Sequence, residues 1–141
     1  MTDNEQPIAP ADQPGFVRAR FRSFGHAFRG WWYVMRTQHN AWIHALISVV
    51  VIIVAFWLRI GAGDWAVLVL AIAMVFAAEF MNTAIEVVVD LASPQMHPLA
   101  KIGKDVGAAA VMLTALAAVV IGLLILGPPL WSRLAPYLFR P

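Results

Sequence analysis

Four polar side chains interrupt the end of a long apolar stretch and share one face of a predicted helix. Residues 65–78 are all apolar or small, and they are followed, at steps of three or four residues, by Glu79, Asn82, Glu86 and Asp90. Such steps place side chains on one helix face. A charged group at membrane depth costs roughly 2.5 to 3.5 kcal/mol and usually faces a protein interior or a polar cavity. This acidic stripe therefore predicts a functional site, with a structural polar clamp between helices as the alternative.

The acidic stripe and the pair Lys104-Asp105 together supply the groups that phosphoryl transfer requires. That reaction needs a cation to hold phosphates, carboxylates to hold magnesium and a base for the acceptor's hydroxyl proton. Glu79 is the deepest acid and suits a general base, while Glu86, two turns nearer water, suits a magnesium ligand. A non-enzymatic oligomer that conducts protons or ions is the other functional class. The Lys104-Asp105 pair favours the kinase, because a conduction path needs no such pair at the start of the next span.

The composition indicates a small membrane protein. The 141 residues are 61% hydrophobic and 13% charged, which is too apolar for a soluble domain of this length. The absence of cysteine excludes disulfides and thiolate metal sites. The net charge of +2 gives no indication of nucleic-acid binding. The usual Gly-rich phosphate loop, the zinc-protease motif, the nucleophile elbow and the dinucleotide fingerprint are also missing.

Hydrophobic periodicity predicts an all-α membrane protein whose helices position the acidic stripe. We expect a disordered tail over 1–14 and a membrane domain over 15–127, followed by a short tail over 128–141. Within that domain we expect an amphipathic interfacial helix over 15–36 and membrane spans over 41–58, 64–91 and 106–126. A polar loop over 92–105 would join the last two spans. A signal peptide is the competing interpretation of the first helix, but its arginines and aromatic residues argue against it.

The basic residues predict the orientation in the membrane. On one side of the three spans lie Arg18, Arg20, Arg22, Arg29, Arg36, Lys101 and Lys104, whereas the other side carries Arg59, Arg133 and Arg140. The positive-inside rule then places the amino terminus and the polar loop in the cytoplasm and the carboxyl terminus outside. The acidic stripe would therefore run from lipid depth at Glu79 to cytoplasmic water at Asp90.

Two motifs, one along the acidic stripe and one within the polar loop, form a specific pattern. They are Glu79-x-x-Asn82-Thr83-Ala84-Ile85-Glu86-x-x-x-Asp90 and His97-Pro98-Leu99-Ala100-Lys101-Ile102-Gly103-Lys104-Asp105. From about Phe21 to Leu126 the chain closely resembles the bacterial integral-membrane diacylglycerol kinase and undecaprenol kinase family. The resemblance implies a lipid kinase of the bacterial inner membrane that uses ATP and Mg²⁺. It also implies a homotrimer with shared active sites and a lipid substrate that is either diacylglycerol or undecaprenol.

The resemblance assigns roles to individual residues. Glu79 matches the family's catalytic base, and Glu86 matches a magnesium ligand that also adjoins ATP. The remaining ATP contacts that it implies are His26, Gln95, His97, Lys104 and Asp105. The lipid contacts that it implies are Asn40, Trp42, His44, Trp57 and Asn82. Asp90 is expected to belong to a structural polar network.

One position departs from the family pattern. Relatives carry a second metal-binding Glu at the junction of the first helix and the first span, where this chain has Gln38. An amide offers magnesium only a neutral carbonyl oxygen, so the site loses one unit of negative charge. We therefore expect a weaker metal site.

Overall fold

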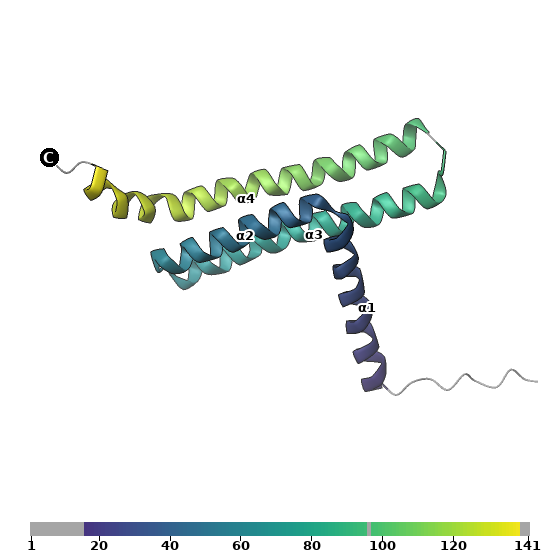
Figure 1. Cartoon of the computed structure of the whole chain (residues 1–141), viewed down its shortest axis with the longest axis horizontal. Coiled ribbons are helices and arrows are strands. Elements are labelled where there is room, and N and C mark those ends of the chain that lie inside the picture. Colours follow the sequence, from purple (N-terminus) through teal and green to yellow (C-terminus); the bar gives the residue numbers. More distant parts are fainter. Residues whose placement is uncertain (1–15, 96, 139–141) are drawn as a thin grey trace, which may run out of the picture. The chain divides into compact units, whose positions relative to one another are not determined.

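The computed structural model describes residues 16–95 and 97–138, and this part of the chain is entirely helical apart from short connections (Figure 1). The helices are α1 (Phe16–Thr37), α2 (His39–Leu58), α3 (Ala62–Ala92) and α4 (Pro98–Leu138). The predicted all-α class is confirmed. The predicted tail over 1–14 lies outside the described residues.

The chain divides into two compact units, one ending at Tyr33 and the other beginning at Val34. The first unit contains most of α1. The second contains the last turn of α1 together with α2, α3 and α4. A single non-helical residue, Gln38, separates α1 from α2, with an extended backbone at φ −102° and ψ 110°. Its N–H still donates to the carbonyl oxygen of Val34 over 2.8 Å, which fixes the backbone at the start of α2.

Three of the helices are long and apolar enough to cross a membrane. α2, α3 and α4 contain 20, 31 and 41 residues, and at a rise of about 1.5 Å per residue each reaches the roughly 30 Å of a hydrocarbon core. Their large apolar side chains are mostly exposed, as Leu70 on α3 and Leu124 on α4 illustrate. A surface of this kind is stable against lipid or another apolar protein surface. The protein is therefore an integral membrane protein.

A tight turn connects α2 to α3. Arg59 ends α2 in the left-handed region, at φ 55° and ψ 48°, and its N–H donates to the last turn of the helix. This conformation costs an ordinary residue about 1 to 2 kcal/mol, and the bonds to otherwise unpaired helix-end carbonyls offset that cost. Only Ile60 and Gly61 then remain before α3 begins. The short turn makes α2 and α3 antiparallel neighbours.

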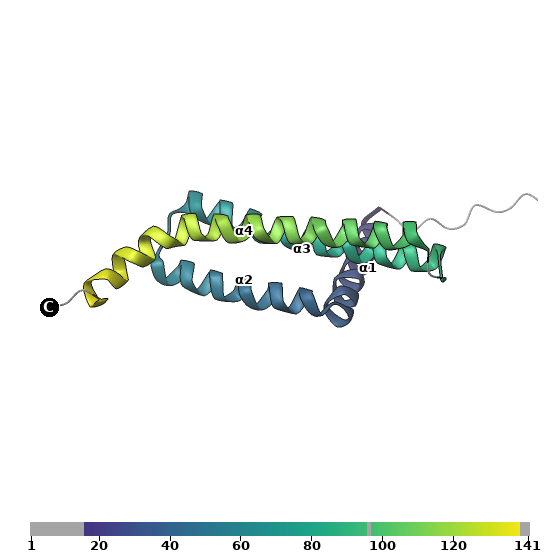
Figure 2. The ribbon, with the colours of Figure 1, turned by 90° about the horizontal axis from the view of Figure 1, so that it is seen from above.

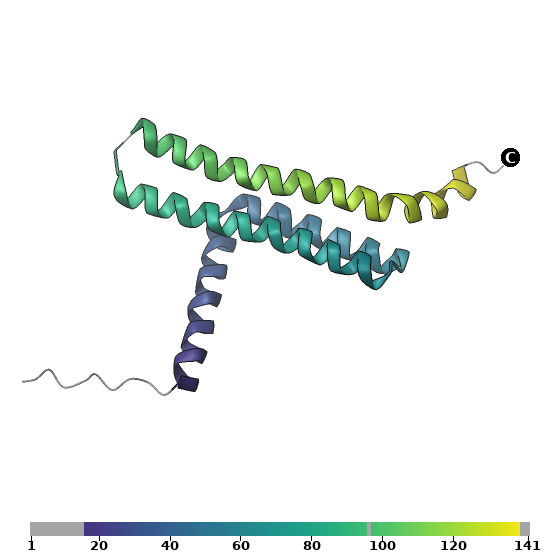
Figure 3. The same ribbon diagram turned by 180° about the vertical axis from the view of Figure 1, so that it is seen from behind.

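The most extensive helix contact joins α3 to α4, which run antiparallel and side by side (Figures 1 and 3). α2 lies along both of them (Figure 2). One buried cluster near the α2–α3 turn consists of Ala55, Leu58, Leu68 and Leu126. A second, near the start of α2, contains Val34, Met35 and Ala41, against which Phe80 packs. The acidic stripe begins beside this second cluster.

α4 is longer at both ends than the predicted span over 106–126. The predicted polar loop over 92–105 is already helical from Pro98. At the other end, the helix continues through Pro128 and Pro129 to Leu138. Because proline removes a backbone donor and crowds the preceding turn, a bend is expected there, and α4 changes direction near its carboxyl end (Figure 1). Packing of Leu130 against the first cluster holds the helix beyond the prolines.

Candidate active site

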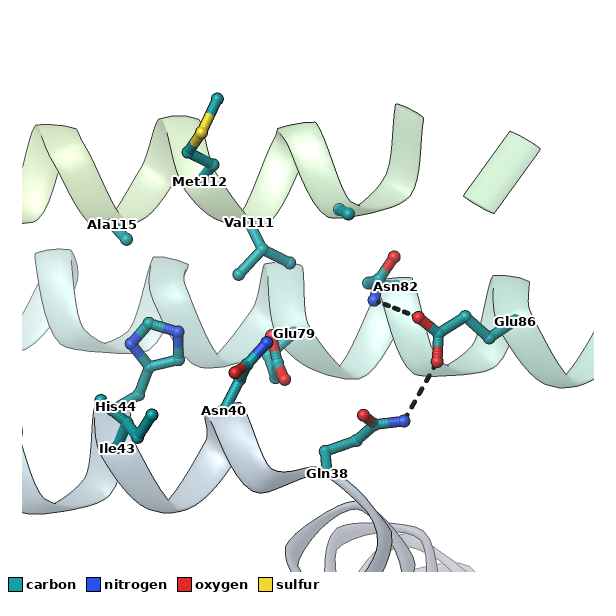
Figure 4. Close-up of a pocket in the computed structure, with 11 residues that line it drawn as sticks. Gln38, Asn40, Ile43, His44, Glu79, Asn82, Glu86, Val111, Met112 and Ala115 are labelled. Carbon is teal, nitrogen blue, oxygen red and sulfur yellow. Dashed lines mark hydrogen bonds between the residues drawn. The ribbon is translucent and has the colours of Figure 1, made fainter. Parts of the chain in front are cut away.

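The acidic stripe borders a pocket of about 310 Å³ between α2, α3 and α4 (Figure 4). The start of α2 contributes Gln38, Asn40, Ile43 and His44. α3 contributes Glu79, Asn82 and Glu86. α4 contributes the apolar or small residues Ala108, Val111, Met112 and Ala115. The pocket thus has a mostly polar wall on α2 and α3 and an apolar wall on α4.

Glu79 is the most deeply buried ionisable residue of the described chain, with only 2% of its surface exposed. It lies one helical turn from Thr83, whose hydroxyl donates to the Glu79 carbonyl oxygen over 2.9 Å. The Glu79 side chain lies across from Asn40 and His44 on α2 (Figure 4). A carboxylate that lines a pocket beside polar side chains is well placed to accept a proton from a bound hydroxyl group.

Glu86 is held between two amides at the other end of the pocket. Asn82 Nδ2 donates to Glu86 Oε1 over 2.9 Å, and Gln38 Nε2 donates to Glu86 Oε2 over 3.1 Å (Figure 4). Each carboxylate oxygen has a second lone pair that remains available to a cation. The two amides therefore fix the direction of the carboxylate without neutralising its charge.

The Glu86 carboxylate fits a ligand of a magnesium ion. Mg²⁺ is usually held by one or two carboxylates, substrate phosphates and retained waters rather than by a cage of protein ligands. Among the described residues, no group of three or more His, Asp or Glu side chains could hold a metal by itself. A single carboxylate, held in place by two amide N–H groups, matches a site that nucleotide phosphates and water would complete.

Two ion pairs lie about one helical turn beyond the pocket. Lys104 Nζ lies 2.5 Å from Asp90 Oδ1 and joins α4 to α3. Lys101 Nζ lies 2.6 Å from Asp105 Oδ2 within the first turns of α4. Asp90 follows Glu86 by four residues, so this charged region continues the same face of α3. Both residues of the predicted Lys104-Asp105 nucleotide contact thus have an internal partner.

The structure brings together six of the predicted site residues in the pocket, namely Gln38, Asn40, His44, Glu79, Asn82 and Glu86. It places Trp57 elsewhere, at the far end of α2, where the Arg133 guanidinium lies 5.0 Å from the ring centroid. Trp42 is 59% exposed and does not line the pocket.

The remaining predicted ATP contacts lie on other segments. Gln95 is in the α3–α4 connection, where its carbonyl oxygen accepts from Ser93 Oγ over 3.0 Å. His97 Nδ1 accepts from the Leu99 N–H over 3.2 Å at the start of α4. His26 belongs to the first unit, where its ring nitrogen Nδ1 is 3.1 Å from Arg29 Nη2.

Sequence reasoning missed the α4 wall of the pocket. Ala108, Val111 and Ala115 carry no chemical signal, although steps of three and four residues place them on one helix face. That periodicity marks a packed face without identifying its partner. Their contribution to the pocket depends on how α4 packs against α3, which the sequence does not specify.

Comparison with known proteins identifies the family. Residues 25–126 match the family described as prokaryotic diacylglycerol kinase. An undecaprenol kinase of Bacillus subtilis is 43% identical over 110 residues, which cover 78% of this chain and 89% of the relative. A diacylglycerol kinase of Synechocystis is 47% identical over 137 residues, covering 89% and 78%. A diacylglycerol kinase of Escherichia coli K12 is 29% identical over 126 residues, covering 84% and 93%. The resemblance predicted from the two motifs is therefore confirmed, and the chain belongs to the prokaryotic diacylglycerol kinase family of lipid kinases.

Proposed function

We propose that this protein transfers the γ-phosphoryl group of ATP, in the presence of Mg²⁺, to the terminal hydroxyl of diacylglycerol or undecaprenol. The observation that carries the proposal is a pocket between three helices long and apolar enough to span a membrane, which contains two acids with different surroundings. Glu79 is 2% exposed, whereas Glu86 is held by two amides near the charged end of α3. Family membership favours this function over the ion-conducting oligomer.

The two acids divide the chemistry between them. Glu79 accepts the proton of the lipid hydroxyl as its oxygen attacks the γ-phosphorus. The bond between that phosphorus and the bridging oxygen breaks, and ADP leaves. Glu86 would hold Mg²⁺ near the phosphates, and the bound ion would offset their negative charge. Lys104 would contact the phosphates one turn beyond the pocket, with Asp105 beside it, and the predicted contacts at His26, Gln95 and His97 remain part of this proposal.

The lipid would enter between the exposed apolar side chains that line the pocket on α2 and α4. Met112 lines the pocket and is 61% exposed, and Ile43 lines it and is 44% exposed. A lipid chain or a neighbouring subunit would cover these side chains in the membrane. This openness supports the proposed lipid contacts at Asn40 and His44, and it is consistent with a homotrimer in which subunits share active sites.

The proposed placement is in the bacterial inner membrane. The basic residues support an amino terminus and an α3–α4 connection in the cytoplasm, with the carboxyl terminus outside. α1 would lie in the membrane interface, since its exposed Phe21, Phe24 and Phe28 recur at helical spacing among arginines. This arrangement turns the charged end of the pocket toward cytoplasmic ATP.

Phosphorylation of the two candidate lipids tests the proposal directly. Purified protein is incubated with radiolabelled ATP, Mg²⁺ and vesicles that contain either diacylglycerol or undecaprenol. We expect a labelled lipid from at least one of them and loss of labelling when Mg²⁺ is chelated. No labelling of either lipid by folded protein, together with proton flux into the same vesicles, would support the ion-conducting oligomer instead.

Gln38→Glu is expected to lower the free Mg²⁺ concentration needed for half-maximal activity by about tenfold, which corresponds to about 1.4 kcal/mol. Gln38 Nε2 is 3.1 Å from Glu86 Oε2, so the substitution would place two carboxylates together and increase their attraction for a cation. Activity is measured against free Mg²⁺ at saturating ATP. Gln38→Ala is the matched control, because it removes the amide without adding charge. An unchanged or higher Mg²⁺ requirement in Gln38→Glu would show that another group replaces the missing ligand.

Asp90→Asn is expected to lower the KM for ATP by up to about fivefold. The Asp90 carboxylate competes with phosphates for Lys104, and an exposed ion pair of this kind is worth about 0.2 to 1 kcal/mol. Steady-state kinetics with varied ATP measure the change. Asp64→Asn makes the same charge change in the first turn of α3, at the opposite end of that helix from Asp90, and should leave the KM unchanged. A higher KM in Asp90→Asn would mean that the ion pair orients Lys104 instead of competing for it.

A further inference from the structure

We infer that Gly107 is a positioning residue for Glu86 and that it acts through the side-chain amide of Asn82. The inference rests on the proposed function, in which Glu86 holds Mg²⁺. Gly107 itself is buried in the first half of α4. Its importance would come from the space that its missing side chain leaves.

The first observation is the unusual state of the Asn82 amide. Asn82 is only 8% exposed, and its Nδ2 donates to Glu86 Oε1 over 2.9 Å. Its Oδ1 is buried and has no hydrogen-bond partner. This oxygen points toward α4 and away from Glu86 (Figure 4). Because a buried amide oxygen normally finds a donor, a specific feature of α4 must accommodate it.

The second observation identifies that feature as Gly107. A Cβ atom built on Gly107 would overlap Asn82 Oδ1 and would lie 3.4 Å from Asn82 Cγ. The amide oxygen therefore occupies the space that any other residue's side chain would fill. Contacts between a backbone Cα–H and a carbonyl oxygen recur at helix–helix interfaces, and a glycine permits the close approach that they need.

The two observations together fix the orientation of the amide. Turning the amide by half a rotation would direct Oδ1 at the Glu86 carboxylate, where two acceptors would face each other. The Asn82 Cα would lie at the ordinary contact distance of 3.8 Å from the added Cβ, so the overlap falls on the Asn82 side chain and not on the backbone of α3. A side chain at position 107 would therefore displace the Asn82 amide, and Glu86 would keep only the hydrogen bond from Gln38.

Gly107→Ala is accordingly expected to weaken cation binding at Glu86 by about tenfold, the lower end of the usual effect of losing a group that orients a metal ligand. Mn²⁺ serves as a spectroscopic probe, and its binding is measured by electron paramagnetic resonance with a non-hydrolysable ATP analogue present. The free Mg²⁺ required for half-maximal lipid phosphorylation should rise by the same factor. The rate at saturating Mg²⁺ should change less, because Glu79 lies outside the contact.

α4 offers a matched control one turn earlier. A Cβ on Gly103 would meet only Val89 Cγ2, at the ordinary contact distance of 3.8 Å. Gly103→Ala makes the same chemical change on the same helix and also faces α3. It should leave Mn²⁺ binding within about twofold of the wild-type value. Equal losses in Gly103→Ala and Gly107→Ala would show that α4 rigidity matters and would overturn the inference.

The double variant Asn82→Ala/Gly107→Ala separates positioning from helix packing. With the amide removed, the added methyl group has room, so Gly107→Ala should cause no further loss of Mn²⁺ binding in the Asn82→Ala background. Losses that multiply in the double variant would contradict the inference. If Gly107→Ala alone does not fold, the double variant should restore folding. A double variant that also fails to fold would show that Gly107 serves only helix packing.

The same measurements distinguish this inference from the proposed function. If wild-type protein phosphorylates neither lipid but the Mn²⁺ results follow the expected pattern, the proposed function fails while the positioning role of Gly107 stands. If lipid phosphorylation occurs and Gly107→Ala binds Mn²⁺ as the wild type does, the positioning role fails alone.

Discussion

Glu79→Gln is expected to reduce the rate of lipid phosphorylation by at least about 100-fold, the lower range of general-base catalysis. The amide has the same shape as the carboxylate but cannot accept the proton of the lipid hydroxyl. Because Glu79 is 2% exposed, water cannot easily substitute for it in that position. Initial rates are measured at saturating ATP, Mg²⁺ and lipid. Folding and assembly, followed by circular dichroism and size-exclusion chromatography, should remain close to wild type.

Thr83→Val is the matched control for this variant. Thr83 lies one turn from Glu79 and is 3% exposed, so the substitution also alters a buried polar group on the same helix without changing its shape. Its hydroxyl donates only to the helix backbone, and the rate should therefore stay within about threefold of wild type, given the small net worth of one hydrogen bond. If Glu79→Gln retains more than about a tenth of the wild-type rate, equivalent to a barrier change under roughly 1.4 kcal/mol, the base is another group.

Glu86→Ala is expected to raise the Mg²⁺ and ATP concentrations needed for half-maximal activity by at least about tenfold, in line with the loss of a group that supports a metal site. The Glu86 carboxylate accepts hydrogen bonds from the amides of both Asn82 and Gln38. Its removal leaves two N–H donors facing the position that a cation would occupy, which repels the ion. Activity against free Mg²⁺ at several ATP concentrations measures the change. Isothermal titration with a non-hydrolysable ATP analogue measures binding separately from the rate.

Glu86→Gln shows whether charge or packing causes this loss. It preserves the volume of the side chain and removes its charge, so an effect close to that of Glu86→Ala is expected. A variant with the Mg²⁺ dependence of the wild type would remove Glu86 from the proposed metal site. A carboxylate that binds Mg²⁺ would then have to come from a neighbouring subunit.

The sequence by itself determined the class of the protein, its long helices and the face of α3 that carries the acidic stripe. These properties are local. A run of apolar residues predicts a membrane helix wherever it packs, and the spacing of Glu79, Asn82 and Glu86 fixes their shared face from helix geometry alone. The two motifs around the α3–α4 connection were specific enough to predict the family that the comparisons confirm.

The ends of the helices were less predictable. The last span was predicted over 106–126, with a short tail over 128–141, and proline at positions 128 and 129 disrupts helix hydrogen bonds just beyond that span. α4 nevertheless continues to Leu138, and Leu130 packs against the buried cluster around Leu126. Packing from other helices outweighed the local preference, and no local pattern in the sequence reports such packing.

Only the tertiary structure decided which groups surround the acids. Helix periodicity predicts which residues share a face. It does not determine how each helix is rotated about its axis or its register along the neighbouring helix. Gln38 donates to Glu86 across 48 positions of sequence separation, Lys104 pairs with Asp90, and the missing side chain of Gly107 makes room for Asn82 Oδ1. Each contact depends on how two helices are set against each other. The chemistry of the acidic stripe could therefore be predicted from its residues, whereas the orientation of each acid depended on the packing of α2 and α4 against α3.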